Sequence, residues 1–596
     1  MAILACVVAA AVVLLVVGNV VEFRGSPQVE DGTVAFGRPV GSVATSSWRR
    51  LRLTRPSGTT VLYVSTAVLY LAVGAYLILG RASIVGDAES RVAQAWYVVG
   101  SRDPHLAAIG FVWNPLPSFA AIPVVLFRGI WPALTQEAFA GAIVSSLCMA
   151  GAVVQFRLAL RDMQTTTSIA RVLTACFALN PMTVYYGSNG MSEAMYLLFL
   201  VGAARYLLGW SVTGGLRLLV LVAINLGLGY LTRYETVAAA LSVALVVFFV
   251  GTRARDRSRP VRERRLAAGS DVVVVLFPVV IAFVAWAVVS WVITGQPFQQ
   301  FTSSYGNASI IRATAGAVGS NGSGLPKIAL ALLQTMSYAP LIVLVGIVVL
   351  VVGIRRRDRR FWALAPLAGP LAFSTLAYVD GQTFGFLRYY IPVLPLYLLA
   401  GALLLTPLPS MRPASPAWLA RGRFAGVLAA LLIGVPGLVG STLAMASPTL
   451  GPGEQQYLAW VVGPATTTVE VQARAFLPSA RSIAGQIDKL GLPDGSIALD
   501  TFNCGSLVVM NSERPHQFII TSDRDFQKVV ADPVAFNVPY VLVPQDGEGI
   551  EAIGVAHPGI YDGGQIADLQ TQVVAQYKTA GCSTYRLIRV TSDKAN

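Results

Sequence analysis

Charged residues are scarce in this chain of 596 residues. Only 12% of them are Asp, Glu, Lys or Arg, whereas 55% are hydrophobic, and the mean hydropathy is +0.63. A composition so poor in charge excludes an ordinary soluble enzyme and is typical of a protein that crosses a membrane many times. The chain also has only three histidines and contains no CxxC, HExxH or GxxxxGK pattern. These absences argue against a structural zinc site and against an ATP-driven pump.

The net charge of +14 is unevenly distributed. Residues 446–596 hold 15 acidic and 10 basic residues, a net charge of −5, so the remainder of the chain carries +19. Much of this positive charge lies in short clusters between apolar segments, at residues 49–55, 253–265, 355–360 and 412–423. Cytoplasmic loops beside anionic lipid show this pattern. We therefore place the four clusters in the cytoplasm and expect no nucleic-acid partner.

Apolar segments recur along the chain, and we predict about 12 transmembrane helices. With the basic clusters inside, both termini lie outside, and the external segments are 81–137, 187–191, 232–235, 295–327, 379–388 and the C-terminal region. The stretch 115–127 contains three prolines and is too short to span, so we expect an interfacial helix. The predicted spans are 2–17, 59–80, 138–156, 169–186, 192–210, 216–231, 236–250, 272–293, 331–352, 361–378, 389–405 and 424–445.

The region after the last span has a different pattern. We predict helices at 472–490 and 523–530 and short strands at 496–500, 517–521, 540–544 and 585–590, which together indicate a small α/β domain. The predicted fold class is an α-helical polytopic membrane protein with a C-terminal extracytoplasmic α/β domain. Its parts are residues 1–58 (a first span and a cytoplasmic basic linker), 59–445 (the membrane domain) and 446–596 (the soluble domain).

Five cysteines are present in the whole chain. Cys6, Cys148 and Cys176 lie in apolar spans, where we expect inert packing residues. Cys504 and Cys582 are the two in the polar C-terminal region. In an extracytoplasmic domain they are candidates for a disulfide, and two buried free thiols are the alternative.

Polar side chains that are not basic loop markers gather in the predicted external segments. Asp87 and Glu89 follow the span 59–80, and Arg91 lies two residues further on. Charges this close to hydrocarbon are costly and often functional, although these acids could simply mark the polar end of a helix. The other external stretches carry the further candidates Tyr186, Glu193, Arg233, Tyr234, Glu235, Tyr305, Asp380, Arg388 and Tyr389.

One side of the membrane therefore holds carboxylates together with arginines. The arginine fork binds phosphate through two hydrogen bonds, and a carboxylate can take a proton from a hydroxyl, so such a site suits an anionic lipid headgroup. Simpler roles exist for single residues. Glu193 could cap a helix, Arg233 could pair with Glu235, and Tyr389 could belong to an aromatic belt.

The order of these features resembles the C-type glycosyltransferase superfamily (GT-C). It is most similar to the bacterial branch related to protein O-mannosyltransferases and the aminoarabinose transferases of lipid A (family 39-like). The resemblance covers residues 59–405. It rests on residues 86–89 (Gly-Asp-Ala-Glu), 113–117 (Trp-Asn-Pro-Leu-Pro), 180–193 (from Asn-Pro to Ser-Glu), 231–235 (Leu-Thr-Arg-Tyr-Glu) and 388–395 (Arg-Tyr-Tyr-Ile-Pro-Val-Leu-Pro).

The resemblance implies an inverting hexosyl- or pentosyltransferase of the plasma membrane. Its donor would be a polyprenyl-phosphate sugar, and its acceptor a glycan, a lipid or a protein outside the cytoplasm. Asp87 would be the catalytic base, with Glu89 and Glu193 as further catalytic residues, and Arg91, Arg233 and Arg388 would bind the donor phosphate. The family often shows two adjacent acids at this loop, whereas this chain has Asp-Ala-Glu, and on a helix Asp87 and Glu89 would point in different directions. The substrate-binding candidates are Tyr186, Tyr234, Glu235, Tyr305, Asp380 and Tyr389.

No cofactor is specified by the sequence, and a divalent metal stays possible. The prevalence of Ala, Val, Arg and Gly over Lys suits a GC-rich actinobacterium, for which decaprenyl-phosphate mannose or arabinose and a role in the cell envelope are natural guesses. Two alternatives stay open. One is a transporter or flippase of a lipid-linked glycan, and the other is a scaffold whose C-terminal domain binds a partner.

Overall fold

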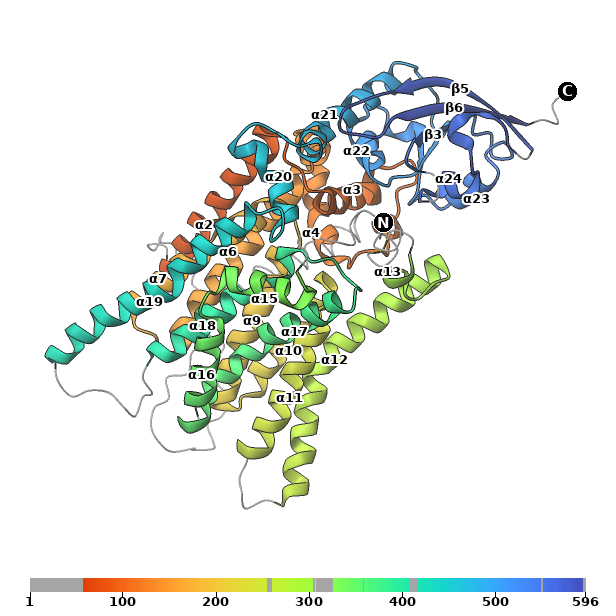
Figure 1. Ribbon diagram of the computed structural model, residues 1–596. Coiled ribbons are helices and arrows are strands. Elements are labelled where there is room, and N and C mark those ends of the chain that lie inside the picture. Colours follow the sequence, from red (N-terminus) through yellow and green to blue (C-terminus); the bar gives the residue numbers. More distant parts are fainter. Residues whose placement is uncertain are drawn as a thin grey trace, which may run out of the picture.

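The computed structural model describes residues 57–254, 260–303, 306, 325–356, 358–406, 416–547, 550–566 and 568–592. The predicted span 2–17 and the candidate Tyr305 lie outside these residues. Long helices form a bundle, and a sheet with flanking helices covers one end of it (Figure 1). The chain is therefore a helical membrane protein with a C-terminal α/β domain, as the sequence predicts.

Among the described residues, eight helical segments are long and apolar enough to cross a membrane. All eight correspond to predicted spans. They are α2 with η1 (Gly58–Ala75 and Tyr76–Gly80), α6 (Phe139–Asp162), α9 (Glu193–Thr213), α11 (Thr236–Ala254), α12 (Val261–Thr294), η4 with α17 (Arg359–Leu364 and Ala365–Val379), η5 with α18 (Leu387–Tyr390 and Val393–Leu405) and α19 (Pro416–Met445).

Three predicted spans differ from this simple pattern. The span 331–352 is instead two helices, α15 (Lys327–Tyr338) and α16 (Ile342–Arg356), bent by 78° at a break that contains Pro340. Proline cannot donate a backbone hydrogen bond and disfavours a helical residue before it. The span 169–186 is likewise divided into α7 (Thr167–Ala178) and α8 (Pro181–Ser188), and α10 (Leu216–Thr232) has only 17 residues. The number of 12 spans therefore stays a prediction.

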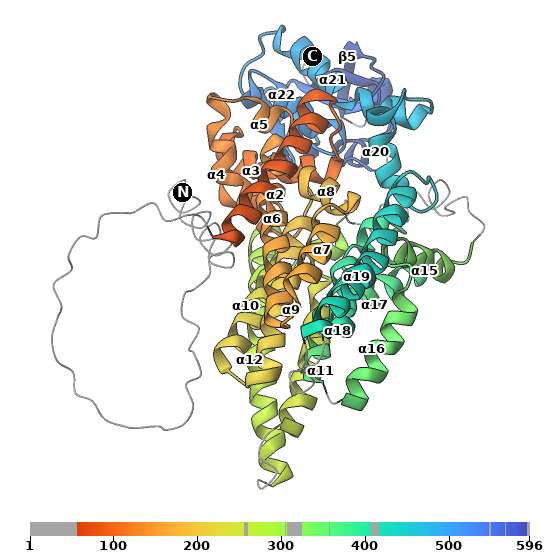
Figure 2. The same ribbon diagram turned by 90° about the vertical axis from the view of Figure 1, so that its left-hand side faces the viewer.

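Successive helices run in opposite directions, so that every second loop lies at the same end of the bundle. At one end, Arg360 Nη1 donates to the carbonyl of Met163 at 3.1 Å, and the hydroxyls of Thr406 and Thr165 are 3.1 Å apart. These residues adjoin the loops that the sequence assigns to the cytoplasm. The C-terminal domain and the segment 81–137 lie at the opposite end of the bundle (Figures 1 and 2).

Burial divides the bundle into inner and outer helices. Most side chains of α6, α9 and α18 are buried in one continuous apolar core. The helices α12, α16 and α19 instead expose apolar side chains such as Phe277, Leu350 and Leu432. A soluble protein would not present so much apolar surface, whereas a lipid bilayer accommodates it.

The segment 81–137 folds into short helices on top of the bundle. The acids Asp87 and Glu89 lie in the first turn of α3, where the helix dipole favours negative charge. The apolar helix that the sequence predicts at 115–127 is present. The elements are α3 (Gly86–Gly100), η2 (Leu106–Ile109), α4 (Leu116–Val125), η3 (Leu126–Gly129) and α5 (Ala133–Gln136).

The C-terminal domain is built on a mixed sheet of strand order β2-β1-β3-β6-β5-β4, in which β1 pairs in parallel with β2 and β3, and the other pairs are antiparallel. The four predicted strands and both predicted helices are present, whereas β4 and β5 were not predicted. The strands are β1 (Ile497–Leu499), β2 (Phe518–Ile520), β3 (Tyr540–Pro544), β4 (Gly564–Ile566), β5 (Leu569–Tyr577) and β6 (Tyr585–Ser592). The helices are α20 (Pro452–Val462), α21 (Thr468–Asp488), α22 (Cys504–Asn511), α23 (Phe526–Ala531) and α24 (Ala552–Ala556).

This domain packs directly on the segment 81–137. Val92 of α3 and Ile483 of α21 are fully buried members of one shared apolar cluster. Arg102, which follows α3, also pairs with Asp523 at 3.1 Å and with Asp525 at 2.5 Å. The C-terminal domain is therefore held as a fixed wall over the segment that carries Asp87.

Candidate functional site

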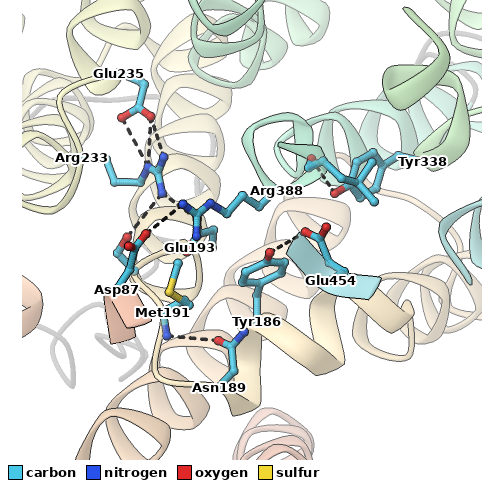
Figure 3. A network of polar contacts seen from close by, with 12 residues as sticks. Asp87, Tyr186, Asn189, Met191, Glu193, Arg233, Glu235, Tyr338, Arg388 and Glu454 are labelled. Carbon is cyan, nitrogen blue, oxygen red and sulfur yellow. Dashed lines mark hydrogen bonds and ion pairs between the residues drawn. The ribbon is translucent and has the colours of Figure 1, made fainter. Parts of the chain in front are cut away.

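Two arginines and three carboxylates form one ionic network at the end of the bundle beneath the C-terminal domain (Figure 3). Arg388 donates to Asp87 Oδ2 at 2.8 Å, and its Nε lies 3.8 Å from Glu193 Oε1. Arg233 donates to Glu193 Oε1 and to Glu235 Oε1, both at 2.7 Å. These residues come from four separate segments, all of which the sequence assigns to the same side of the membrane.

A third arginine and several aromatic rings surround the network. The ring of Tyr389 lies against both Arg233 and Arg388, with centroid distances of 5.3 and 5.4 Å. Arg91, one helical turn after Asp87, lies over the ring of Trp113 at 5.2 Å. Arg91 is 6% exposed, and its Nε and Nη1 have no hydrogen-bond partner among the described residues. Since buried donors are normally satisfied, Arg91 has capacity to bind an anion.

A tight turn positions Glu193. Gly190 has a φ of +82°, and a Cβ at this position would lie only 3.1 Å from the backbone of Gly141 on α6. Only glycine adopts this conformation readily in such close contact. The side chain of Asn189 then accepts a hydrogen bond from the backbone N–H of Met191 at 3.1 Å (Figure 3). The turn thereby brings Glu193, at the start of α9, under Arg233.

Asp87 is the most accessible acid of the network. Its side chain is 30% exposed, whereas that of Glu193 is 1% and that of Glu235 is 7% exposed. Burial by itself would raise the pKa of Asp87, but the charges of Arg388 and Arg91 and the hydrogen bond from Arg388 outweigh it and hold the pKa below its usual value. Asp87 is therefore ionised at neutral pH and able to accept a proton.

Glu89 points away from the arginines, because α3 is helical and residues two apart diverge on a helix. It is 2% exposed and faces the C-terminal domain, where burial raises its pKa to about 8 against a smaller opposing effect of a hydrogen bond with Ser506. Its Oε1 has no hydrogen-bond partner among the described residues. At neutral pH most Glu89 side chains are therefore protonated.

Glu454 on α20 is a buried acid of the site that the sequence analysis missed. Its Oε1 accepts a hydrogen bond from the hydroxyl of Tyr186 at 2.5 Å (Figure 3). Burial raises the pKa of Glu454, which is 1% exposed. Glu454 lies nine residues after the span 424–445, and Asp87 lies seven residues after the span 59–80, so its position in the sequence could have made Glu454 a candidate, although it does not reveal the contact with Tyr186.

The remaining candidates of the sequence analysis are Tyr234, Asp380 and Tyr305. The ring of Tyr234 contacts Phe301 and Phe373 at centroid distances of 5.9 and 6.1 Å. Asp380 is exposed at the end of α17, and within the described part of the chain no ion pair joins it to an arginine. Tyr305 lies outside the described residues.

A cavity of about 1070 Å³ opens beside Asp87. Its walls are α3, the stretch from His105 to Trp113, the end of α12, α20, and the C-terminal domain at residues 500–506 and 521–527. A disulfide joins Cys504 to Cys582, with a Cα–Cα distance of 5.9 Å, and so links two neighbouring parts of this wall. Asp87 thus contacts the arginines on one side and the cavity on the other.

The carboxylates of this site are paired with arginines rather than grouped as metal ligands. In the part of the chain that the structure describes, no three His, Cys, Asp or Glu side chains are placed to hold one metal ion. A divalent cation bound through protein oxygens needs several such ligands around one point. The metal that the sequence leaves possible has no ligand set among these residues.

No protein-family model and no curated protein matches the chain. Similar solved structures include ArnT from Cupriavidus metallidurans bound to undecaprenyl phosphate, with 15% identity, a TM-score of 0.48, and 90% of this chain and 98% of that chain covered. They also include the Archaeoglobus fulgidus oligosaccharyltransferase with Zn and sulfate (11% identity, TM-score 0.43, 82% and 68% covered). A third is AglB from the same organism with an inhibitory peptide and a dolichol-phosphate (12%, 0.42, 82% and 70%).

Proposed function

We propose that the chain is a glycosyltransferase of the membrane, of the GT-C type that its sequence resembles. It transfers a sugar from a polyprenyl-phosphate donor to a hydroxyl group of an acceptor outside the cytoplasm. The observation that carries this proposal is the position of Asp87, which is paired with Arg388 at 2.8 Å and still 30% exposed at the wall of a large cavity. A base that joins an anion-binding cluster to an acceptor cavity is what such a transfer requires.

Asp87 acts as the general base in this proposal. It accepts the proton of the acceptor hydroxyl while the hydroxyl oxygen forms a bond to the anomeric carbon of the sugar. The bond between that carbon and the phosphate oxygen breaks, and polyprenyl phosphate leaves with the electron pair. Attack opposite to the leaving group inverts the anomeric carbon. Because a phosphate is a good leaving group, no separate acid is needed.

Arg91 and Arg388 hold the donor phosphate. Arg233 is already engaged by Glu193 and Glu235, whereas Arg91 has unpartnered donors and Arg388 has an Nε without a hydrogen bond. Arginine at these positions can bind the phosphate of the donor and stabilise the additional negative charge that develops as the phosphate leaves. Arg233 is a positioning residue, because its ion pair holds the side chain of Glu193 in the site.

The polyprenyl chain has an apolar surface available next to this cluster. Phe301 is 50% and Phe373 is 38% exposed, and both pack on Tyr234, the neighbour of Arg233. A lipid in the membrane could therefore extend its chain along α17 while its phosphate reaches the arginines. This arrangement supports a lipid-linked donor over a soluble nucleotide sugar.

We assign the cluster and the C-terminal domain to the outside of the plasma membrane. The C-terminal end of α11 and the N-terminal end of α12, which carry basic residues, lie at the opposite end of the bundle (Figure 1), and the positive-inside rule assigns basic loops to the cytoplasm. A disulfide such as Cys504–Cys582 persists in an oxidising compartment, which supports the same orientation. Decaprenyl-phosphate mannose or arabinose as donor, with a role in cell-envelope glycan or glycoprotein synthesis, is the specific form that we propose to test first.

The test is sugar transfer by the purified full-length protein in lipid nanodiscs. A panel of radiolabelled polyprenyl-phosphate sugars is offered with a membrane extract as the source of acceptor. We expect incorporation from at least one donor by the wild type and a loss of about 100-fold or more in Asp87→Asn, as for removal of a general base. Incorporation at the wild-type rate by a folded Asp87→Asn protein would refute the role of Asp87.

No specific observation favours a flippase of a lipid-linked glycan. A transporter is expected to carry its charged groups near the middle of the membrane, between two repeated halves. Glu193, Arg233 and Arg388 instead lie at helix ends on one side of the bundle. If no donor is used in the transfer assay, a lipid-flipping assay is the measurement that follows.

A further inference from the structure

We propose that the cavity beside Asp87 binds a neutral oligosaccharide, and that this oligosaccharide is the acceptor. The inference rests on the proposed transferase function and names the acceptor class for it. The cavity has a volume of about 1070 Å³. Sites for single small molecules typically have roughly 300–1,000 Å³. The cavity lies at the upper end of this range, which gives room for more than one sugar unit.

Seven side-chain amides lie among the polar residues of the walls. An amide has donors and an acceptor on one group, which matches hydroxyl groups that also donate and accept. Six glutamines from five segments of the chain line the cavity, and Asn503 adds a seventh amide. Amides spread over several walls suit a ligand that carries hydroxyl groups along its length. The glutamines are Gln94, Gln296, Gln299, Gln456, Gln472 and Gln527.

Aromatic side chains alternate with these amides. Trp113 and Tyr457 lie on the side of Asp87, and Phe476 and Phe502 lie on the side of the C-terminal domain. Sugar rings have apolar C–H faces between their hydroxyl groups, and flat aromatic rings offer matching apolar area together with a fixed shape. The combination of amides and aromatic rings is therefore complementary to a carbohydrate.

The charge of the cavity argues against an anionic acceptor. The carboxylates of Asp87, Asp500 and Asp523 line it beside the protonated Glu89, and Arg524 is the one arginine or lysine among its lining residues in the described part of the chain. Arg524 is itself paired with Asp103. A phosphorylated lipid headgroup in this place would be repelled, because like charges brought together without water are unfavourable. A neutral glycan meets no such repulsion.

The wall that the C-terminal domain contributes is rigid. Asn503 has φ 49° and ψ −125°, a conformation that is strained for a residue other than glycine and is retained only where the surroundings enforce it. The adjacent Cys504 is fixed to Cys582 by the disulfide. Gly581 packs so closely on α21 that a Cβ would lie 2.3 Å from the backbone of Ala475. A preformed wall lowers the entropic cost of ordering a flexible oligosaccharide.

The test measures binding without any donor, so that it does not depend on transfer. Full-length protein in nanodiscs is titrated calorimetrically with manno- and arabino-oligosaccharides, from disaccharide to hexasaccharide, and with uncharged serine-containing peptides. The double variant Gln472→Ala with Gln527→Ala removes two exposed amides from the cavity wall. The matched control is Gln486→Ala. Gln486 lies on the same helix as Gln472, outside the cavity lining, and its amide donates to Ser482.

We expect an affinity that increases with oligosaccharide length. Each lost amide should weaken binding about 2- to 12-fold, the effect of one net hydrogen bond, and Gln486→Ala should bind as the wild type does. The inference is overturned if no oligosaccharide binds, if the peptides bind in its place, or if the double variant, with an unchanged melting temperature, binds normally. If binding behaves as expected but no donor supports transfer, the oligosaccharide site stands and the transferase function falls.

Discussion

The buried carboxyl of Glu89 should make the stability of the protein dependent on pH, and Glu89→Gln should remove that dependence. Glu89 on α3 is 2% exposed and faces Ser506 of the C-terminal domain. Its pKa in the folded protein is about 8, compared with an ordinary value of 4.5. Below pH 4.5 both the folded and the unfolded chain carry this proton. As the pH rises from 4.5 to 8, the unfolded chain releases the proton while the folded chain keeps it, so the folded state loses stability.

The size of the effect follows from the two pKa values. One pH unit between them corresponds to about 1.4 kcal/mol, so the full interval from 4.5 to about 8 corresponds to roughly 5 kcal/mol at most. Relaxation of the structure around the charge reduces this value, and we expect roughly 2–4 kcal/mol. Glutamine has the shape of the protonated glutamate and no charge. The variant should therefore be only slightly more stable than the wild type at pH 5 and much more stable at pH 9.

The assay is thermal unfolding of the purified protein from pH 5 to pH 9, compared between wild type and variant at each pH. The comparison is needed because burial also raises the pKa of Asp523 to about 6 and that of Glu551 to about 10, and these groups act in both proteins. Glu513→Gln, at an exposed position, is the control and should follow the wild type. Parallel curves for wild type and Glu89→Gln over the whole range would refute the reasoning.

Three further predictions concern the site and its wall. Arg91→Gln should raise the KM for the donor about 10- to 100-fold with little change in melting temperature, the effect of one hydrogen bond to a charged group; an unchanged KM would exclude Arg91 from donor binding. The disulfide Cys504–Cys582 closes a sequence separation of 78, so serine at both positions should lower the free energy of unfolding by about 4 kcal/mol, measured by thermal unfolding beside the reduced wild type. Gly581→Ala should destabilise the protein by about 1–3 kcal/mol, because its Cβ would overlap the backbone of Ala475; an unchanged melting temperature would show that the wall can move.

Eight membrane-spanning helices could be predicted because hydropathy is a local signal. Eight spans follow directly from apolar runs of sufficient length. The bend before α16 was missed although its cause, Pro340, is visible in the sequence, because the apolar run continues on both sides of it. The strand β5 was missed as well, although Leu569 and Thr571 alternate with exposed glutamines there. In both cases the sequence contains a local signal, but the residues on either side of it favour a different prediction.

Several residues of the candidate site could be predicted from the sequence, but their arrangement could not. Arg233, Arg388 and Asp87 were selected because they share one side of the membrane, and the structure brings them into one network. Their pairing depends on tertiary contacts between segments 40 to 301 residues apart, which no local pattern encodes. The separation of Glu89 from Asp87 required knowing that α3 is helical, and Glu454 required knowing that α20 folds back over Tyr186.

The measurement that tests the central claim most directly is the single-turnover rate of sugar transfer from prebound donor in Asp87→Asn. A general base acts on the chemical step, so we predict a rate constant lower by about 100-fold or more, with donor affinity changed much less. Asp494→Asn, at an exposed position of the C-terminal domain, should transfer at the wild-type rate. A rate for Asp87→Asn close to that of the wild type would contradict the account.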